Sequence, residues 1–423
     1  MMHKTSKNQV WGVSVTTALL LMWGGCIFSP TEATEPIPTT INVSSTLLYL
    51  GIGESVSIEA VVLDENRLPI EDAPLNWSSS EPEIVSVNNQ GVLTVHSFGR
   101  ADITVKSGAS EATVVVIVSK DRAALVAIYN ALGGPAWENS ANWASSFPIS
   151  AWHGVTVSPD DRVTELNLWG NGLSGVLPAA LGDLDELRIL DLGGNSITGN
   201  IPGAVGQLRN LEEFRIAHAN LSGEIPASLG NFPKLRILAL GMNDLSGSIP
   251  SSLGNLVNLE GLWLYENALS GEIPGSVGRL ENLVDLSLSS NRITGSIPSE
   301  LGNMSSLRFI SLQNNGLSGQ IPPELGNLAV LEELRLSNNQ LSGSIPPELG
   351  GLGNLDLLYL NHNIRLTGAL PFELTQLTML RSLDLIGTGL CAPTHPDFRA
   401  WLEMVRGLRF SNTLGGVVFC SGN

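Results

Sequence analysis

Residues 307–330 read LRFISLQNNGLSGQIPPELGNLAV, and residues 331–354 repeat the pattern as LEELRLSNNQLSGSIPPELGGLGN. The same 24-residue grid runs from Val163 to Thr388 as ten units, the last incomplete and shifted by one extra residue in IRLTG. Its fixed asparagines are Asn171, Asn195, Asn243, Asn267, Asn291, Asn315 and Asn339. Such a period predicts stacked repeats, because one unit cannot close its own apolar core.

Each position of the unit L-x-x-L-x-L-x-x-N-x-L-S-G-x-I-P-x-x-L-G-x-L-x-x has a physical task. The L-x-L pair predicts a short parallel strand whose leucines point inward while the residue between them faces out. The asparagine can satisfy backbone groups where the strand turns away. Two units depart from this ladder, because Ala219 and Thr388 stand where asparagine is expected.

This unit resembles the plant-type leucine-rich repeat. The resemblance implies an α/β solenoid with a concave parallel sheet and a convex side of 3-10 or irregular structure, over residues 161–388. Open ends would expose the leucine core, so caps are expected at residues 120–160 and 389–423. The C-terminal cap contains the helix-like PDFRAWLEMVRGL, and a disulfide between Cys391 and Cys420 is expected to close it.

The N-terminal cap begins with DRAALVAIYNALGG, whose apolar residues recur at helical spacing. Trp137, Trp143 and Trp152 follow within a short span. Three tryptophans can form a sugar-stacking surface, but large side chains are also what a capping layer needs. We favour the capping role.

Residues 39–119 show short runs with period-2 alternation and predict an all-β sandwich. The segment WSSSEPEIVSV, which begins at Trp77, resembles the core of the bacterial immunoglobulin-like domain, group 2. The resemblance implies an immunoglobulin-like sandwich without an internal disulfide, used as a spacer or adhesion unit. Residues 27–38 before it are rich in Pro, Thr and Glu and predict a linker.

Residues 1–26 read as an export signal with a basic start and a short apolar region. Cys26 ends a run that resembles a bacterial lipobox, which implies lipidation at Cys26, although cleavage near Ala33 is an alternative because Trp23 departs from the motif. We therefore expect an extracellular or cell-envelope protein, secreted or held at the outer surface by a lipid. Membrane contact is expected only through that anchor.

Charge and residue spacing argue against several classes of function. The formal net charge is -18, which repels phosphate backbones and excludes nucleic acid as an expected partner. The six histidines are scattered, and neither metal-ligand spacing nor a phosphate-binding loop is present. We expect no enzyme activity, no cofactor and no metal.

Recognition is expected on the concave face, because its positions vary between units while the stacking positions stay fixed. Asp191 and Arg215 are expected to pair there across adjacent strands. The candidate ligand-binding residues are Trp169, Arg215, His218, Met242, Trp263, Tyr265, Glu266, Arg335 and Tyr359.

The resulting hypothesis is a monomeric protein that binds a protein or peptide, or mediates adhesion, through the concave face. Carbohydrate binding through Trp169, Trp263, Tyr265 and Tyr359 is an alternative. A purely architectural element of the envelope is another.

Overall fold

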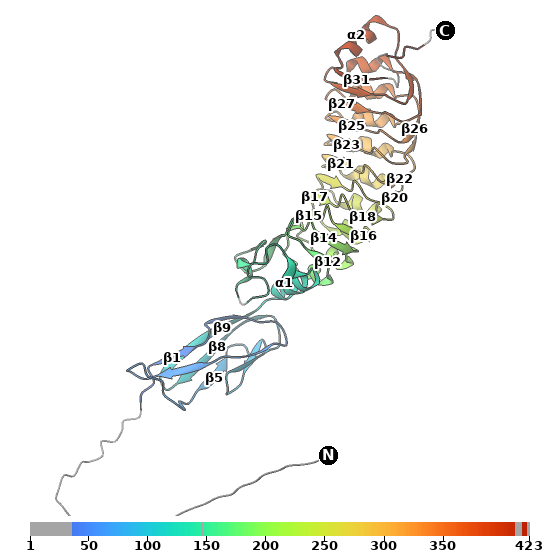
Figure 1. Ribbon diagram of the computed structural model, residues 1–423. Helices are drawn as coiled ribbons and strands as arrows, with labels where there is room; N and C mark the ends of the chain where they lie inside the picture. Colours follow the sequence, from blue (N-terminus) through green and yellow to red (C-terminus); the bar gives the residue numbers. More distant parts are fainter. Residues whose placement is uncertain (1–35, 146, 411–416, 421–423) are drawn as a thin grey trace, which may run out of the picture.

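The computed structural model describes residues 36–145, 147–410 and 417–420. The predicted signal and Cys26 lie outside these residues. Within them, a domain made only of strands precedes a curved stack of repeats (Figure 1). The long sheet of the stack follows the inner side of the curve, which makes this sheet the concave face.

The N-terminal domain has three sheets, with strand orders β2-β9-β8-β5, β3-β7-β6 and β1-β4. Trp77 of β5 is half-buried between the two apolar clusters of the domain. The immunoglobulin-like family itself stays a prediction. The strands are β1 (Thr40–Val43), β2 (Leu47–Tyr49), β3 (Ser55–Ser57), β4 (Ala60–Leu63), β5 (Asn76–Ser79), β6 (Val85–Val87), β7 (Val92–Val95), β8 (Gly99–Ser107) and β9 (Ser110–Val118).

The first end of the stack is covered by helix α1 (Lys120–Ala131) and the 3-10 turns η1 (Gly134–Ala136) and η2 (Ile149–Ala151). The hydroxyl of Ser119 caps α1 by accepting from the amide of Arg122. The three tryptophans of this segment are at most 6% exposed, and neighbouring rings lie about 5 Å apart, as measured for Trp137–Trp143 (4.9 Å) and Trp143–Trp152 (5.0 Å). Burial on this scale serves the core and leaves no face for a sugar.

A partly buried ion pair ties this cap to the first repeat. Asp121 is fully buried and accepts two hydrogen bonds of 3.1 Å from the guanidinium of Arg162. The same carboxylate accepts from the amide of Val163 at 2.7 Å. A buried charge with this many partners is tolerated, and it fixes the cap against the strand that starts at Val163.

The concave face is a single sheet of twelve strands, in which the strands from β11 onward pair in parallel in chain order. The predicted parallel sheet is therefore confirmed, and it is one strand longer at each end because both caps contribute. Strand β10 (Val155–Val157) pairs antiparallel with β11, with a register shift between Thr156 and Val157. The others are β11 (Val163–Asn167), β13 (Ile189–Asp191), β15 (Glu213–Arg215), β17 (Ile237–Ala239), β19 (Gly261–Trp263), β21 (Asp285–Ser287), β23 (Phe309–Ser311), β25 (Glu333–Arg335), β27 (Leu357–Tyr359), β29 (Ser382–Asp384) and β31 (Gly407–Arg409).

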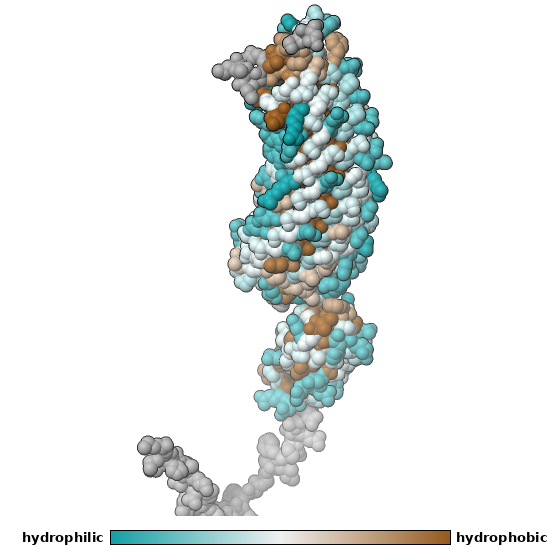
Figure 2. All heavy atoms as spheres, turned by 90° about the vertical axis from the view of Figure 1, so that its right-hand side faces the viewer, coloured by the Kyte–Doolittle hydropathy of each residue, from teal (hydrophilic) through white to brown (hydrophobic). Residues whose placement is uncertain are grey.

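A second, interrupted ladder runs along another side of the stack, in the orders β12-β14-β16-β18, β20-β22 and β24-β26-β28-β30. Its strands are β12 (Ser174–Val176), β14 (Ser196–Gly199), β16 (Asn220–Glu224), β18 (Asp244–Ser246), β20 (Ser270–Gly271), β22 (Arg292–Ile293), β24 (Ser318–Gly319), β26 (Gln340–Gly343), β28 (Arg365–Ala369) and β30 (Gly389–Cys391). Figure 2 looks onto this side, where apolar residues along the repeats occur in small scattered groups.

Each of the nine complete repeats closes with a short 3-10 helix. These helices begin directly after the fixed prolines, which suit an extended position ahead of the turn. They are η3 (Ala179–Asp183), η4 (Gly203–Gln207), η5 (Ala227–Asn231), η6 (Ser251–Asn255), η7 (Gly275–Arg279), η8 (Ser299–Asn303), η9 (Pro323–Asn327), η10 (Pro347–Gly351) and η11 (Phe372–Gln376).

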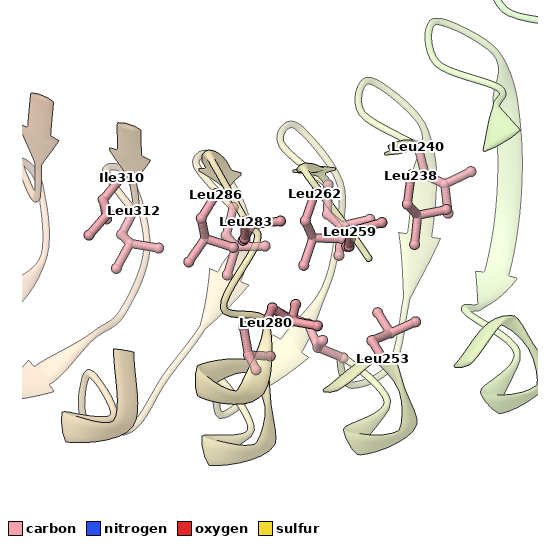
Figure 3. Close-up of a cluster of buried hydrophobic side chains, with 14 of the residues drawn as sticks. Leu238, Leu240, Leu253, Leu259, Leu262, Leu280, Leu283, Leu286, Ile310 and Leu312 are labelled. Atoms are coloured by element: carbon pink, nitrogen blue, oxygen red, sulfur yellow. The ribbon is translucent and has the colours of Figure 1, made fainter. Parts of the chain in front are cut away.

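The core is one continuous column of apolar side chains from the first cap to the last. Figure 3 shows how Leu238, Leu262 and Leu286 of successive strands stack over one another, with Leu253 and Leu280 entering from the 3-10 side. All five are fully buried. Stacking buries this surface only between neighbours, which is why the repeats stabilise one another.

The last cap uses helix α2 (Pro396–Met404), which is shorter than the sequence pattern suggested. The chain leaves the helix at Val405 because residues 407–409 join the concave sheet as β31. Phe398 and Trp401 of α2 cover the end of the core. Cys391 and Cys420 form a disulfide with their Cα atoms 4.9 Å apart.

Candidate functional site

The concave face presents three outward positions per repeat: the first and third residues of each strand, and the residue two places further along. The pairing is in register along the sheet, so each position forms a straight row. For example, Gly261, Asp285, Phe309 and Glu333 follow one another in the first row. Trp263, Ser287, Ser311 and Arg335 follow in the second. The tyrosine Tyr265 belongs to the third row.

The aromatic residues of this face lie against glycines. A Cβ on Gly241 would stand 2.7 Å from the ring of Tyr265, and one on Gly261 would stand 3.2 Å from the ring of Trp263. The indole of Trp169 covers Gly193 and Gly194 in the same way. Trp169 nevertheless stays 64% exposed, whereas Trp263 and Tyr265 are half-buried.

The two candidate arginines are already engaged. Arg215 donates two hydrogen bonds, of 3.0 and 2.7 Å, to Glu213 of its own strand. Arg335 donates to Glu333 of its own strand at 2.9 Å. The expected pairing of Arg215 with Asp191 is wrong.

The difference arises from side-chain length. The short side chain of Asp191 accepts a hydrogen bond of 3.1 Å from the amide of Gly193, two residues further along its own repeat. The long side chain of Arg215 then reaches the glutamate two residues away, which lies on the same face of the strand. Arg215 also lies over the ring of Trp263, and Arg335 lies over the ring of Tyr359.

Three further candidates occupy the turn that leaves the strand. His218, Met242 and Glu266 each precede a ladder position and adopt left-handed φ values of 54°, 56° and 51°. The same conformation recurs at Gly194 and Asn314 in other repeats. These side chains are therefore set by a strained turn at the rim of the face, a feature that the sequence pattern did not reveal.

A shallow hollow of about 480 Å³ lies over β19, β21, β23 and β25. We call it the central hollow. It brings together three of the sequence candidates with Phe309, which sequence reasoning did not single out. Its lining consists of two serines with Trp263, Tyr265, Asp285, Phe309, Glu333 and Arg335.

Asp285 is the electrostatically distinctive group in the central hollow. Burial raises the pKa of its carboxyl above the usual value, an interaction with the indole of Trp263 lowers it, and the nearby Glu333 raises it again. Within the described part of the chain, no Lys, Arg or His forms an ion pair with Asp285. The hollow therefore holds a desolvated carboxylate between aromatic walls.

The paired carboxylates elsewhere have structural partners. Glu212 accepts from Arg188 of the preceding repeat at 2.9 and 3.0 Å, and Glu332 accepts from Arg308 at 2.8 Å. Their neighbours Glu213 and Glu333 are held by Arg215 and Arg335. Among the described residues, no group of three or more His, Cys, Asp or Glu side chains could hold a metal ion.

Models of known families match several of these repeats. The family model described as "Leucine rich repeat" matches residues 161–221. A second leucine-rich-repeat model matches residues 234–256, 282–304, 306–328 and 330–352. These repeats are leucine-rich repeats.

Solved structures agree with that assignment. The leucine-rich-repeat ectodomain of the Arabidopsis thaliana receptor kinase GASSHO1/SCHENGEN3, in complex with CASPARIAN STRIP INTEGRITY FACTOR 2, is 38% identical with a TM-score of 0.62, over 66% of this chain and 34% of that one. The plant peptide hormone receptor RGFR1, in complex with RGF2, is 38% identical with a TM-score of 0.54, over 57% and 38%. This chain thus spans little more than a third of either receptor chain.

A plant ice-binding protein is also similar, with 29% identity and a TM-score of 0.59 over 71% of this chain and 97% of that one. No curated protein matches the chain. The likeness extends to the leucine-rich-repeat fold, and the neighbours differ in the function that their descriptions give.

The leucine-rich-repeat sheet brings only some of the candidates together. Trp263, Tyr265 and Arg335 line the central hollow, with Arg215 and Tyr359 at its ends through their ring contacts. Trp169 follows β11, four strands from β19, or about 19 Å away along the sheet. His218, Met242 and Glu266 stand on the rim. The candidates therefore form one central group and several separate positions.

None of the helices among the described residues is long and apolar enough to cross a membrane.

Proposed function

We propose that this chain is an exported, non-enzymatic binding protein that recognises a protein or peptide with its concave leucine-rich-repeat face. The observation that carries the proposal is the central hollow, where aromatic and charged side chains of four neighbouring strands gather. Aromatic residues are the side chains that most often supply binding energy at protein interfaces. Of the two receptors described above, RGFR1 is described as a peptide hormone receptor, and both were solved as complexes on the same fold.

Export is part of the proposal. The disulfide between Cys391 and Cys420 suits an oxidising compartment. Lipid attachment at Cys26 is expected to hold the protein at the cell surface. Radiolabelled palmitate should label the natural chain but leave Cys26→Ser unlabelled. Equal labelling of both proteins would disprove attachment at this cysteine.

Selection from a displayed random-peptide library on the purified chain tests the main proposal. Selected peptides should bind the natural protein and lose at least tenfold in affinity to Trp263→Ala, which removes a central ring. Val257→Ala is the matched control, because Val257 is 55% exposed outside the concave sheet. Failure to select any peptide, or equal loss in both variants, would count against the proposal.

Carbohydrate binding is a second candidate, favoured by Trp169. Its indole lies flat on two glycines and leaves 64% of the residue exposed, as a sugar-stacking ring must. A glycan array with the natural chain and Trp169→Ala tests it. Binding that is absent from the whole array would remove this candidate. An architectural element would tolerate both Trp263→Ala and Trp169→Ala without change.

The N-terminal domain is proposed as an immunoglobulin-like spacer. Leu68 is 61% exposed and Ile52 is 51% exposed on this domain. Changing both to aspartate should leave the affinity for selected peptides unchanged. A clear loss of affinity would instead make this domain a part of the binding surface.

A further inference from the structure

Several acids of the concave face are held by an arginine or by a backbone amide, whereas Asp285 is not. Glu213 is held by Arg215 and Glu333 by Arg335, each across two residues of one strand. Asp384 at the far end forms an ion pair of 3.0 Å with Arg409. Asp191 accepts from a backbone amide. Asp285 alone among these acids has neither an ion-pair partner nor a backbone donor within the described residues.

The surroundings of Asp285 are apolar on both sides. Phe309 is its direct neighbour on β23, and Gly261 is its neighbour on β19. Because Gly261 has no side chain, the ring of Trp263 covers that position. The carboxylate therefore stands in a hollow whose walls exclude water on two sides, which is consistent with its raised pKa.

Two buried polar atoms of the concave face have no well-formed hydrogen bond. Among the described side chains, Trp263 Nε1 and Gln313 Oε1 are both buried without a partner that meets normal geometry. Gln313 follows Ser311 of β23 by two residues, so it extends the same face. Of the two residues, only Trp263 lines the hollow, and its indole interacts with the Asp285 carboxylate. Buried polar groups are nearly always satisfied, so an incompletely bonded donor beside a desolvated carboxylate indicates a surface that another polar group can complete.

The rings themselves are not free cation sites. Arg215 lies 6.0 Å from the centre of the Trp263 ring, and Arg308 lies 5.2 Å from that of Phe309. Both guanidinium groups are held by glutamates. An incoming ligand therefore meets aromatic walls that suit an aliphatic chain, and a single unneutralised carboxylate beyond them.

We propose that the central hollow takes one lysine or arginine side chain of a peptide ligand, with its methylene stem between Trp263 and Phe309 and its charge against Asp285. This inference rests on the proposed function and names its ligand chemistry. Long basic side chains combine an apolar stem with a charged end, which matches this order of surfaces. An acidic ligand is disfavoured because the three nearby arginines, Arg215, Arg308 and Arg335, are already paired with glutamates.

The test uses small probes on the full chain. Nα-acetyl-lysine methylamide and its arginine equivalent should shift the Trp263 indole N–H resonance saturably, with a dissociation constant in the millimolar range. Nα-acetyl-norleucine methylamide carries a similar stem without the charge and should bind at least fivefold more weakly. The glutamate equivalent should produce no saturable shift. Equal shifts from all four probes, or none from the basic ones, would overturn the proposal.

Two variants locate the effect. Asp285→Asn should abolish the preference for basic probes while leaving the other resonances of the sheet in place. Asp191→Asn is the matched control, because it removes a half-buried carboxylate from the same face outside the hollow. Unchanged preference in Asp285→Asn would overturn the assignment. If library peptides bind at Trp263 but the basic probes do not, the inference fails while peptide binding stands.

Discussion

The carboxamide oxygen of Asn243 accepts a hydrogen bond from the amide of Leu221, 22 residues earlier in the chain, at 3.0 Å. Its nitrogen donates to the carbonyl of Ile216 at 2.8 Å and to that of Leu240 at 3.0 Å. The same three contacts recur at Asn267, Asn291, Asn315 and Asn339. Each asparagine thus joins consecutive repeats through backbone groups.

The gap in this ladder predicts a stabilising substitution. Ala219 is 8% exposed and has no carboxamide to accept from the amide of Ile197, which corresponds to Leu221 one repeat later. Ala219→Asn should raise the free energy of unfolding by about 1 kcal/mol, because it adds buried hydrogen bonds. Denaturant titration measures this. The reciprocal Asn243→Ala should lower the same free energy by about 2 kcal/mol, and a stabilised Asn243→Ala protein would contradict the explanation.

The left-handed turn predicts a second stabilising change. Met242 has φ 56°, which costs an ordinary side chain about 1 kcal/mol or more, whereas asparagine tolerates this region. Met242→Asn should therefore raise the thermal and denaturant midpoints, by about 0.5–1 kcal/mol in unfolding free energy. Asn314, with φ 59°, offers the reverse experiment, because Asn314→Met should lose a similar amount. If Met242→Asn and Asn314→Met both raised the free energy of unfolding, backbone strain could not be the cause.

The close approach of the 3-10 helices predicts a destabilising change. A Cβ on Gly254 would stand 2.3 Å from the carbonyl oxygen of Ser276 in the next repeat. Gly254→Ala should therefore lower the free energy of unfolding by about 1–3 kcal/mol. Gly203 lies at the start of η4 with nothing within 4 Å of such a Cβ, so Gly203→Ala should be neutral within about 0.5 kcal/mol. An equal loss of stability in both variants would mean that the effect comes from replacing glycine by alanine in a 3-10 helix, and not from the close contact with Ser276.

The raised pKa of Asp285 predicts that its charged form lowers the stability of the fold, although the same charged form is needed to bind a basic ligand. Because burial favours the protonated form, the folded state loses stability as pH rises through the raised pKa of Asp285. Asp285→Asn mimics the neutral form and should be more stable than the natural chain at pH 7. This advantage should shrink as the pH falls below that pKa.

Denaturant titrations between pH 4 and pH 8 measure the difference, which also reflects the nearby charges of Glu333 and Arg335. The basic probes should bind the natural chain at neutral pH and lose affinity as the Asp285 carboxyl is protonated. A less stable Asp285→Asn protein at pH 7 would mean that the carboxylate supports the fold instead of a ligand.

Much of the fold follows from the repeat itself. The fixed leucines, such as Leu262 and Leu286, are buried as their inward positions predict, and the L-x-L pairs form the parallel sheet. Stacking makes this possible because each repeat packs against a copy of itself. The pattern of residues within one repeat therefore also determines the contacts between repeats.

The candidate site was only partly predictable. Trp263 and Tyr265 were placed on the correct face by strand alternation alone. The role of Gly241 and Gly261 as supports for those rings depends on ring direction, which spacing does not fix. The pairing of Arg215 with Glu213 depended on which of two acids a long side chain reaches. Phe309 was passed over because one aromatic residue between leucines carries no signal until its neighbours in space are known.

The short strand β10, antiparallel and irregular at Thr156, lies at one edge of the concave sheet, and three-residue β31 lies at the other. Neither offers the long, regular row of free amides and carbonyls that another copy would need to extend the sheet. Molecules crowded side by side on one surface should therefore not join through the edges of this sheet, and each should keep its own hollow open to a ligand.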